Sequence, residues 1–524
     1  MSDKIQIFVT MLLYMSVVIG IGVYFYKRAQ KSSENYFLGG RTLGPWVAAM
    51  SAEASDMSGW LLMGLPGVAY WCGLADAFWT AIGLAIGTYV NWLIVAKRLR
   101  NYSAISGNAI TIPDFFSNRF HEKKKVILGI SATFILIFFT VYAASCFVTC
   151  GKLFSTLFGF DYHVMMIVGA VFVIAYTLIG GFLAESVSDF MQAIVMIGAL
   201  IVMVIVGVVN AGGFGAVMEN AKDIPGFFSL NHIATPSVDA NGNQLVSGGA
   251  PLFGDASSYS VLSMFSMLAW GLGYFGVPQV LLRFMAIRKP EEIKRSRRIA
   301  TVWVVISLSV AVFIGIVGRA LMPVNDALLS KGGAESVFIE MATDYLPPII
   351  AGVIMAGILA ATISSSDSYL LIAASSVSKN IYQGIVKKDK EVDDKTFMWL
   401  SRIVLVLIAV IGMIIAWDEN SVIFSIVSFA WAGFGATFGP LMLFSLFWKR
   451  TTRAGAIAGM IAGAATVFIW KLVLNPLGGA FGIYELLPAF IVSSIAIVVA
   501  SLLSKEPEDD IKAEFEQAKT GITE

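Results

Sequence analysis

Long apolar segments follow one another along almost the whole chain, and they set the narrowest limit on its fold. An α-helix of about 20 apolar residues spans a bilayer, whereas a membrane β-barrel would show short alternating segments. The predicted fold class is therefore an all-α polytopic membrane protein with about thirteen transmembrane helices. We expect spans at residues 5–26, 46–70, 75–96, 126–155, 163–181, 187–210, 259–284, 299–321, 348–376, 399–417, 422–447, 455–474 and 483–503.

The composition agrees with this class. Hydrophobic residues make up 57% of the 524 residues and charged residues only 14%, against about 25% charged in a typical soluble domain. The net charge of +1 gives no indication of a nucleic-acid partner. Cys72, Cys146 and Cys150 lie in or beside apolar segments and show neither a disulfide framework nor metal-ligand spacing.

The first apolar segment, 5–26, could be a signal peptide or a retained helix. It is long for a signal core, no basic region precedes it, and no small-residue cleavage site follows it. We interpret it as a retained helix.

Lysine and arginine gather in every second loop. The basic clusters lie at residues 27–41, 97–125, 288–298, 379–395, 449–453 and at Lys505. The positive-inside rule then predicts an N-terminus outside the cell and a C-terminus in the cytoplasm, with a solvated cytoplasmic tail at 505–524. The polar outside loop at 211–258 could be a lid or a tether, and a tether is the preferred interpretation.

A first interruption lies in the 46–70 segment, at SAEASDMSGWLLMGLPG (51–67). It carries Glu53 and Asp56, although an ionisable side chain at membrane depth costs about 2.5–3.5 kcal/mol. Broken helices of this kind hold substrates and ions in secondary transporters. Asp56 is a candidate cation ligand or site organiser, and a structural pair with a buried arginine or lysine is the alternative. The role of Glu53 stays open. Trp60 would share a face with Asp56 on an intact helix.

A second stretch, ILAATISSSDSY (358–369), is rich in hydroxyl groups. Ala361, Ser364 and Ser365 have the spacing of one helix face, and hydroxyl and carbonyl oxygens suit a hard monovalent cation. Asp367 and Ser368 could build a second oxygen site. The alternative is that these serines only bond to their own helix or allow close helix packing.

A third stretch, AWGLGYFGVPQVLLRFMA (269–286), again interrupts an apolar segment with glycines and a proline. Trp270 and Tyr274 flank the break and could wall a small solute, or they could belong to an interfacial aromatic belt. Two broken helices five spans apart indicate inverted repeats. We therefore expect repeat one at about 46–210, repeat two at about 259–447, an extra helix at 5–26 and last helices at 455–503, all within one domain, 1–504.

Asp189 lies in GGFLAESVSDFMQ (180–192), at a predicted helix start. An acid there can simply complement the helix dipole, and this interpretation is slightly preferred over a functional one.

Taken together, these stretches resemble the sodium:solute symporter family over nearly the whole chain, from NYFLGGR (35–41) onward. SDMSGWLLMGLPG (55–67) and AWGLGYFG (269–276) are most similar to its bacterial sodium/proline symporters. The resemblance implies a LeuT-type fold and sodium-driven import of L-proline across the bacterial cytoplasmic membrane by alternating access, with Na⁺ as the coupling ion. It implies no enzymatic activity and no organic cofactor.

The resemblance also implies roles for particular residues. The implied sodium ligands are main-chain oxygens at Ala54, Met57 and Ala361 with the hydroxyls of Ser364 and Ser365, and Asp56 and Ser58 lie adjacent. The implied proline contacts are Trp60, Gly64, Tyr142, Trp270, Tyr274 and Pro278. Asp189 matches an acid of a second sodium site, which Asp367 and Ser368 could complete.

Four residues depart from the pattern of the proline symporters. Glu53 replaces a small residue, Val277 and Gln279 flank Pro278 in place of other residues, and Asp367 occupies a position that is usually uncharged. The alternatives are therefore a sodium symporter for another small amino acid or carboxylate, or a solute sensor on the same fold. The paired broken helices argue against a channel.

Overall fold

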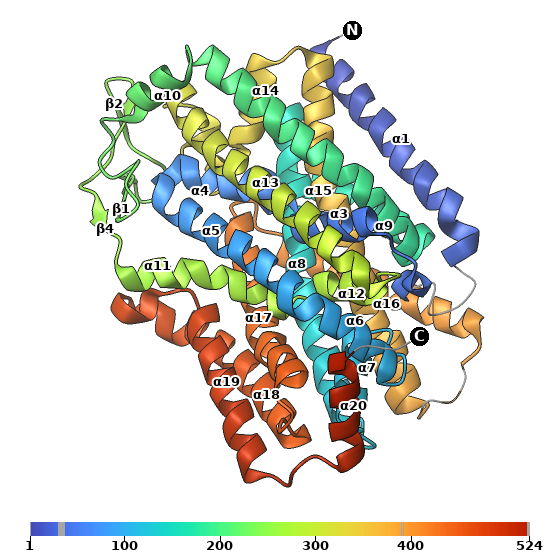
Figure 1. Ribbon diagram of the computed structural model, residues 1–524. Helices are drawn as coiled ribbons and strands as arrows, with labels where there is room; N and C mark the ends of the chain where they lie inside the picture. Colours follow the sequence, from blue (N-terminus) through green and yellow to red (C-terminus); the bar gives the residue numbers. More distant parts are fainter. Residues whose placement is uncertain (1, 30–36, 389, 391, 521–524) are drawn as a thin grey trace.

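The computed structural model describes residues 2–29, 37–388, 390 and 392–520 of the chain, and Figure 1 shows it as a bundle of helices. The long helices are α1 (Asp3–Ala29), α5 (Leu74–Val90), α8 (Val126–Phe158), α9 (Tyr162–Asn210), α13 (Ile293–Leu321), α15 (Pro348–Ser375), α16 (Asp394–Ile415), α17 (Ile423–Phe447), α18 (Arg453–Ile469) and α19 (Leu486–Leu503). The shorter ones are α3 (Pro45–Asp56), α4 (Leu65–Cys72), α6 (Ala96–Ile105), α7 (Ile112–Arg119), α10 (Phe214–Ala221), α11 (Val261–Leu268), α12 (Pro278–Ala286), α14 (Val337–Tyr345) and α20 (Asp509–Thr520).

Membrane-length helices confirm the predicted class, but their count is lower than expected. By length and composition, the described residues hold ten helices that could cross a bilayer, or eleven if the bent pair 261–275 and 278–286 is one span. The two remaining predicted spans coincide with shorter apolar helices, Trp60–Cys72 and Tyr162–Leu178. The first is short because the chain breaks after α3. The second is the start of α9.

Helix α9 differs from the prediction of two separate spans. Its 49 residues are helical throughout, so the expected interruption between 181 and 187 does not break the backbone pattern. A straight helix of that length would measure about 74 Å, more than twice the hydrocarbon thickness.

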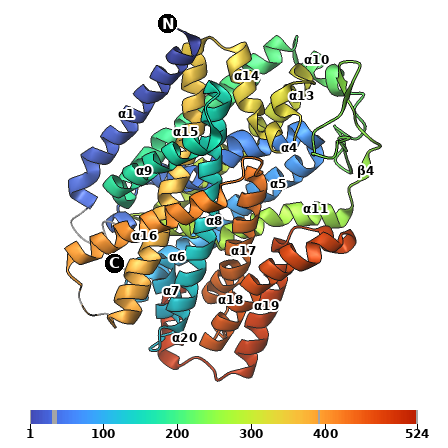
Figure 2. The same ribbon diagram turned by 180° about the vertical axis from the view of Figure 1, so that it is seen from behind.

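Helix α1 packs against both α9 and α15 at the edge of the bundle (Figure 2).

The segment at 211–258 is anchored to the helix ends, so the tether interpretation is wrong. It carries α10 and two small antiparallel pairs, β1 (His232–Ile233) with β4 (Ser257–Ser258) and β2 (Val246–Ser247) with β3 (Ala250–Pro251). Trp79 donates its indole hydrogen to the carbonyl of Leu230, and Tyr259 donates to Asp76. A turn follows Asp239, and backbone hydrogen bonds, chiefly from Asn243, lower the pKa of Asp239.

The C-terminal segment is also packed rather than solvated. Helix α20 lies against α6, and its Phe515 side chain is buried between the guanidinium groups of Arg98 and Arg119, 4.9 and 5.4 Å from its ring. His121 lies between Asp510 and Glu514. The charged composition of this segment predicted solvation. Its apolar residues recur about once per helical turn, however, and form a face that packs against α6.

In Figure 1, α6, α7 and α20 lie toward the bottom, and the N-terminus and α10 lie toward the top. This arrangement agrees with basic clusters on one side of the membrane. The side chains of Lys27 and Arg28, and residues 35 and 36 of the NYFLGGR motif, lie outside the described residues.

Candidate functional site

The first predicted break is present between α3 and α4. Helix α3 ends at Asp56, Met57 adopts a non-helical backbone (φ −90°, ψ 76°), and a π-helical turn follows at Trp60–Gly64. A Cβ atom at Gly59 would overlap the side chain of Thr149 on α8, so only glycine allows the broken segment to approach α8 this closely. The break therefore lies in the buried interior and not at a surface.

The second predicted break is present between α11 and α12. A tight helical segment spans Ala269–Phe275, Val277 is extended, and Pro278 begins α12 at an angle of 43° to the preceding helix. A Cβ atom at Gly273 would overlap the indole of Trp431 on α17. The two breaks face a common interior, because Tyr274 at the second donates its hydroxyl hydrogen to Oδ2 of Asp56 at the first, at 2.6 Å.

Three of the predicted sodium ligands meet across two helices. The hydroxyls of Ser364 and Ser365 on α15 both donate to the main-chain oxygen of Ala54 on α3, at 2.9 and 3.2 Å. Ser364 also lies 3.2 Å from the carbonyl oxygen of Ala361. These oxygens form a small, buried all-oxygen group, which is the donor set that a hard monovalent cation prefers.

The remaining residues of the predicted sodium site line the break. Ser58 is buried and its hydroxyl has no hydrogen-bond partner, and Oδ1 of Asp56 has none either. The sulfur of Met57 is 3.9 Å from the hydroxyl of Ser307 on α13. Unpartnered oxygens on this broken segment fit a region that a cation would complete.

The predicted substrate residues form a buried aromatic cluster. The rings of Trp60 and Trp270 lie 6.1 Å apart, and the hydroxyl of Tyr142 donates to the main-chain oxygen of Asp56. The Trp60 indole donates to the same oxygen at 3.2 Å. Trp60 and Asp56 therefore remain in contact although the helix between them is broken. Gly64 is buried in the π-helical turn, and Pro278 begins α12.

Residues outside the predicted set complete this cluster. Trp431 donates its indole hydrogen to the carbonyl of Trp270 and meets Tyr274 edge-on, with ring centroids 5.0 Å apart. Tyr369 stacks on Tyr142 at 4.2 Å, and Phe424 lies 5.1 Å from Trp270. Trp431 and Phe424 lie in an ordinary apolar segment, so no pattern in the sequence singled them out. Tyr369 ends the hydroxyl-rich stretch 358–369, but nothing in that pattern gave it a role.

The second predicted sodium site contains an arginine. Arg283 of α12 is fully buried, and one of its terminal nitrogens contacts Glu185, Asp189 and Ser368, the last two at 3.1 and 2.8 Å. Ser51 of α3 donates to Asp189 and accepts from Arg283. The guanidinium therefore links α3, α9, α12 and α15 through charge-assisted hydrogen bonds.

Two interpretations of these acids change with the structure. Asp189 lies inside the continuous helix α9, so it cannot complement a helix N-terminus, and the preferred interpretation from the sequence is wrong. The buried pairing with arginine that was considered for Asp56 exists at Asp189. Sequence reasoning also missed Arg283 and Glu185, although a charged residue in each of the two quoted stretches was a usable signal.

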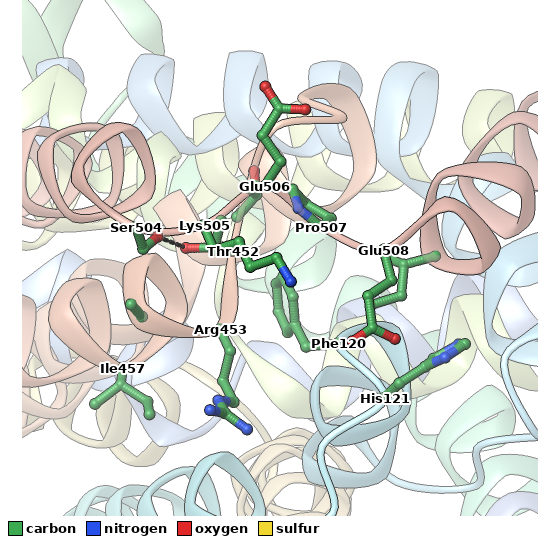
Figure 3. Close-up of a pocket in the computed structure, with 13 residues that line it drawn as sticks. Phe120, His121, Thr452, Arg453, Ile457, Ser504, Lys505, Glu506, Pro507 and Glu508 are labelled. Atoms are coloured by element: carbon green, nitrogen blue, oxygen red, sulfur yellow. Dashed lines mark hydrogen bonds between the residues drawn. The ribbon is translucent and has the colours of Figure 1, made fainter.

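A hollow of about 520 Å³ lies apart from these groups, at the start of α18 and the segment before α20 (Figure 3). Arg453, Lys505 and Glu508 line it, and Thr452 and Ser504 share a hydrogen bond there. None of the predicted site residues reaches it, so the candidate site is the buried region between the two breaks.

Comparison with known proteins agrees with this arrangement. The chain is 42% identical to a sodium/proline symporter of Haemophilus influenzae, over 100% of this chain and 99% of that protein. It is 40% identical to a sodium/proline symporter of Staphylococcus aureus, over 99% of this chain and 97% of that protein.

Solved structures show the same fold. A Na⁺-coupled sialic acid symporter matches with a TM-score of 0.75 at 20% identity, covering 96% of this chain and 99% of that one. The nucleobase-cation symporter Mhp1 matches with a TM-score of 0.53 at 13% identity, covering 93% and 100%. The predicted LeuT-type architecture is thereby confirmed. Residues 36–463 match the description "Sodium:solute symporter family", and the chain belongs to that family.

Proposed function

We propose that this protein is a sodium-coupled symporter that imports L-proline. The observation that carries the proposal is the meeting of Ala54, Ser364 and Ser365 beside a broken helix, next to a buried aromatic cluster. The two full-length relatives at 40–42% identity are sodium/proline symporters, which supports proline as the substrate.

The chemistry of the site fits this pair of solutes. The oxygens at the break would hold Na⁺, and the rings of Trp60, Trp270 and Tyr274 would cover the apolar ring of proline. Residues on α3 and α15 both contribute to the cation group, so sodium would hold these two helices together and favour the substrate-binding shape. Asp189, Asp367 and Ser368 are proposed as a second sodium site beside Arg283.

The driving force is sufficient for uptake. One charge crossing 100 mV supplies about 2.3 kcal/mol, and a tenfold sodium gradient supplies about 1.4 kcal/mol. At one sodium per proline the sum supports accumulation on the order of several hundredfold.

Proteoliposomes test the proposal directly. We expect radiolabelled proline to enter under an inward sodium gradient and not under a potassium gradient. Ser365→Ala and Asp56→Asn should both weaken this uptake, while Ser494→Ala, which removes a half-buried hydroxyl bonded only within α19, should not. Sodium-dependent changes in tryptophan fluorescence without proline uptake would retain the ion site and discard proline.

A further inference from the structure

A second group of buried oxygens belongs to side chains of α3, whereas the serine pair contacts its main chain. Glu53 and Asp56 lie three residues apart on α3, so they share one face of that helix, whereas Ala54 is displaced by about 100° or more around the axis. Their neighbour on this face is the segment that runs from α5 into α6. Glu53 accepts a hydrogen bond from the indole of Trp92 at 3.2 Å.

Among the described residues, no hydrogen-bond donor reaches four acceptors in this group. They are Oε2 of Glu53, Oδ1 of Asp56, the hydroxyl oxygen of Thr88 and Oδ1 of Asn91. All four residues are at most 1% exposed. Thr88 and Trp92 lie about one helical turn apart, so both face α3. Thr88 lies beside Tyr274, and Tyr274 donates its hydroxyl hydrogen to Asp56.

No positive charge compensates these two acids. Among the described residues, no lysine or arginine forms an ion pair with Glu53 or Asp56, and the guanidinium of Arg283 is bound to Glu185 and Asp189. An uncompensated buried carboxylate is costly, and a buried acceptor without a donor is also costly. A bound hard cation would satisfy the two acids, the hydroxyl oxygen and the amide oxygen that lack donors.

We propose that Glu53, Asp56, Thr88 and Asn91 form a further sodium site, separate from the oxygens of Ala54, Ser364 and Ser365. The proposal rests on the sodium coupling proposed above, but it does not depend on proline being the substrate. A cation here would join α3 to the α5–α6 segment, whereas the serine pair joins α3 to α15.

Counting bound sodium ions tests the site in the purified full-length protein. We expect Glu53→Gln and Thr88→Val each to weaken one class of bound sodium by about tenfold or more, as measured with radioactive sodium and by tryptophan fluorescence. Both changes keep the side-chain shape, so folding is preserved. Thr80→Val is the matched control, because Thr80 is a buried threonine on the same helix whose hydroxyl donates to the sulfur of Met267 and not to the acids.

The serine double variant Ser364→Ala/Ser365→Ala separates the two sites. We expect it to lose a sodium ion that Glu53→Gln retains, and to retain the ion that Glu53→Gln loses. If Glu53→Gln and Thr88→Val bind sodium with the number and affinity of the wild type, the proposal is overturned. Absence of proline uptake by the wild-type protein, together with loss of one bound sodium ion in Glu53→Gln, would instead contradict the proposed function and leave this site in place.

Discussion

Two groups of buried acids lie on different sides of α3, and they differ in how their charge is balanced. Glu185 and Asp189 contact the guanidinium of Arg283, which also receives Ser51 and Ser368 as partners. From the part of the chain that the structure describes, Glu53 and Asp56 receive only an indole and a phenol hydrogen. Arg283 already balances part of the charge of the first group, and the sodium proposed at Asp189, Asp367 and Ser368 would bind beside this permanent cation. In the second group, a cation that binds and leaves would have to supply the positive charge.

The largest effect is expected from removing the permanent cation. Arg283→Met leaves Glu185 and Asp189 buried and unpaired, and breaking one partner of a buried ion pair costs about 3–5 kcal/mol. The thermal stability of the purified protein should therefore fall markedly. Arg288→Met is the control, because Arg288 is exposed and pairs with Glu292 on the surface. Equal stability of both variants would contradict the structural role of Arg283.

The next effect is expected at Asp56, which touches both breaks. Asp56→Asn removes the charge but retains a side chain that can bond to Tyr274. A hydrogen bond to a charged group is worth about 1.5–3 kcal/mol, so we expect sodium affinity to fall by about ten- to a hundredfold. Sodium titration of tryptophan fluorescence measures this. Asp76→Asn, at the outer end of α5, should leave the affinity unchanged.

Glu53→Gln should separate the two groups most clearly. It removes an uncompensated charge, so the variant should be at least as stable as the wild type without sodium, whereas Glu185→Gln should be less stable. A ligand present at ten times its dissociation constant raises the free energy of unfolding by about 1.4 kcal/mol. Melting curves with and without sodium should show a smaller sodium-induced gain in Glu53→Gln, and a full gain would count against a cation at Glu53.

The smallest effect is expected at Trp92. Trp92→Phe removes the indole donor to Glu53, whose bond of 3.2 Å is longer than the 2.6 Å bond to Asp56. The bond to Glu53 should therefore lie at the lower end of about 1.5–3 kcal/mol for a bond to a charged group, and sodium affinity should change by about tenfold. Trp303→Phe is matched in size and also loses an indole hydrogen bond, to the neutral carbonyl of Ala193. Affinity that changes equally in both variants would show a packing effect rather than a contact with the acid.

The sequence predicted much of the site because its signals are local. Ala361, Ser364 and Ser365 lie on one helix face by spacing alone, and the glycines and the proline mark the two breaks. The family resemblance added Tyr142 to the predicted site, although no residue spacing connects Tyr142 to the two breaks. Trp431 and Phe424 could not be predicted, because an aromatic residue in an apolar span looks the same whether it faces lipid or a site. Tyr369 lies in the quoted stretch 358–369, but its contact with Tyr142 depends on tertiary packing.

What the sequence by itself determined was the class, the helical segments and the position of both breaks, since these follow from hydrophobicity, chain length and backbone preferences within a few residues. The tertiary structure alone decided which buried charges meet. Arg283 and Glu185 are 98 residues apart, and Trp92 and Glu53 are 39 apart. Electrostatic compensation depends on distance in space, so only the packing of α3 against α9, α12, α13 and α15 could show which acids have a cation and which do not.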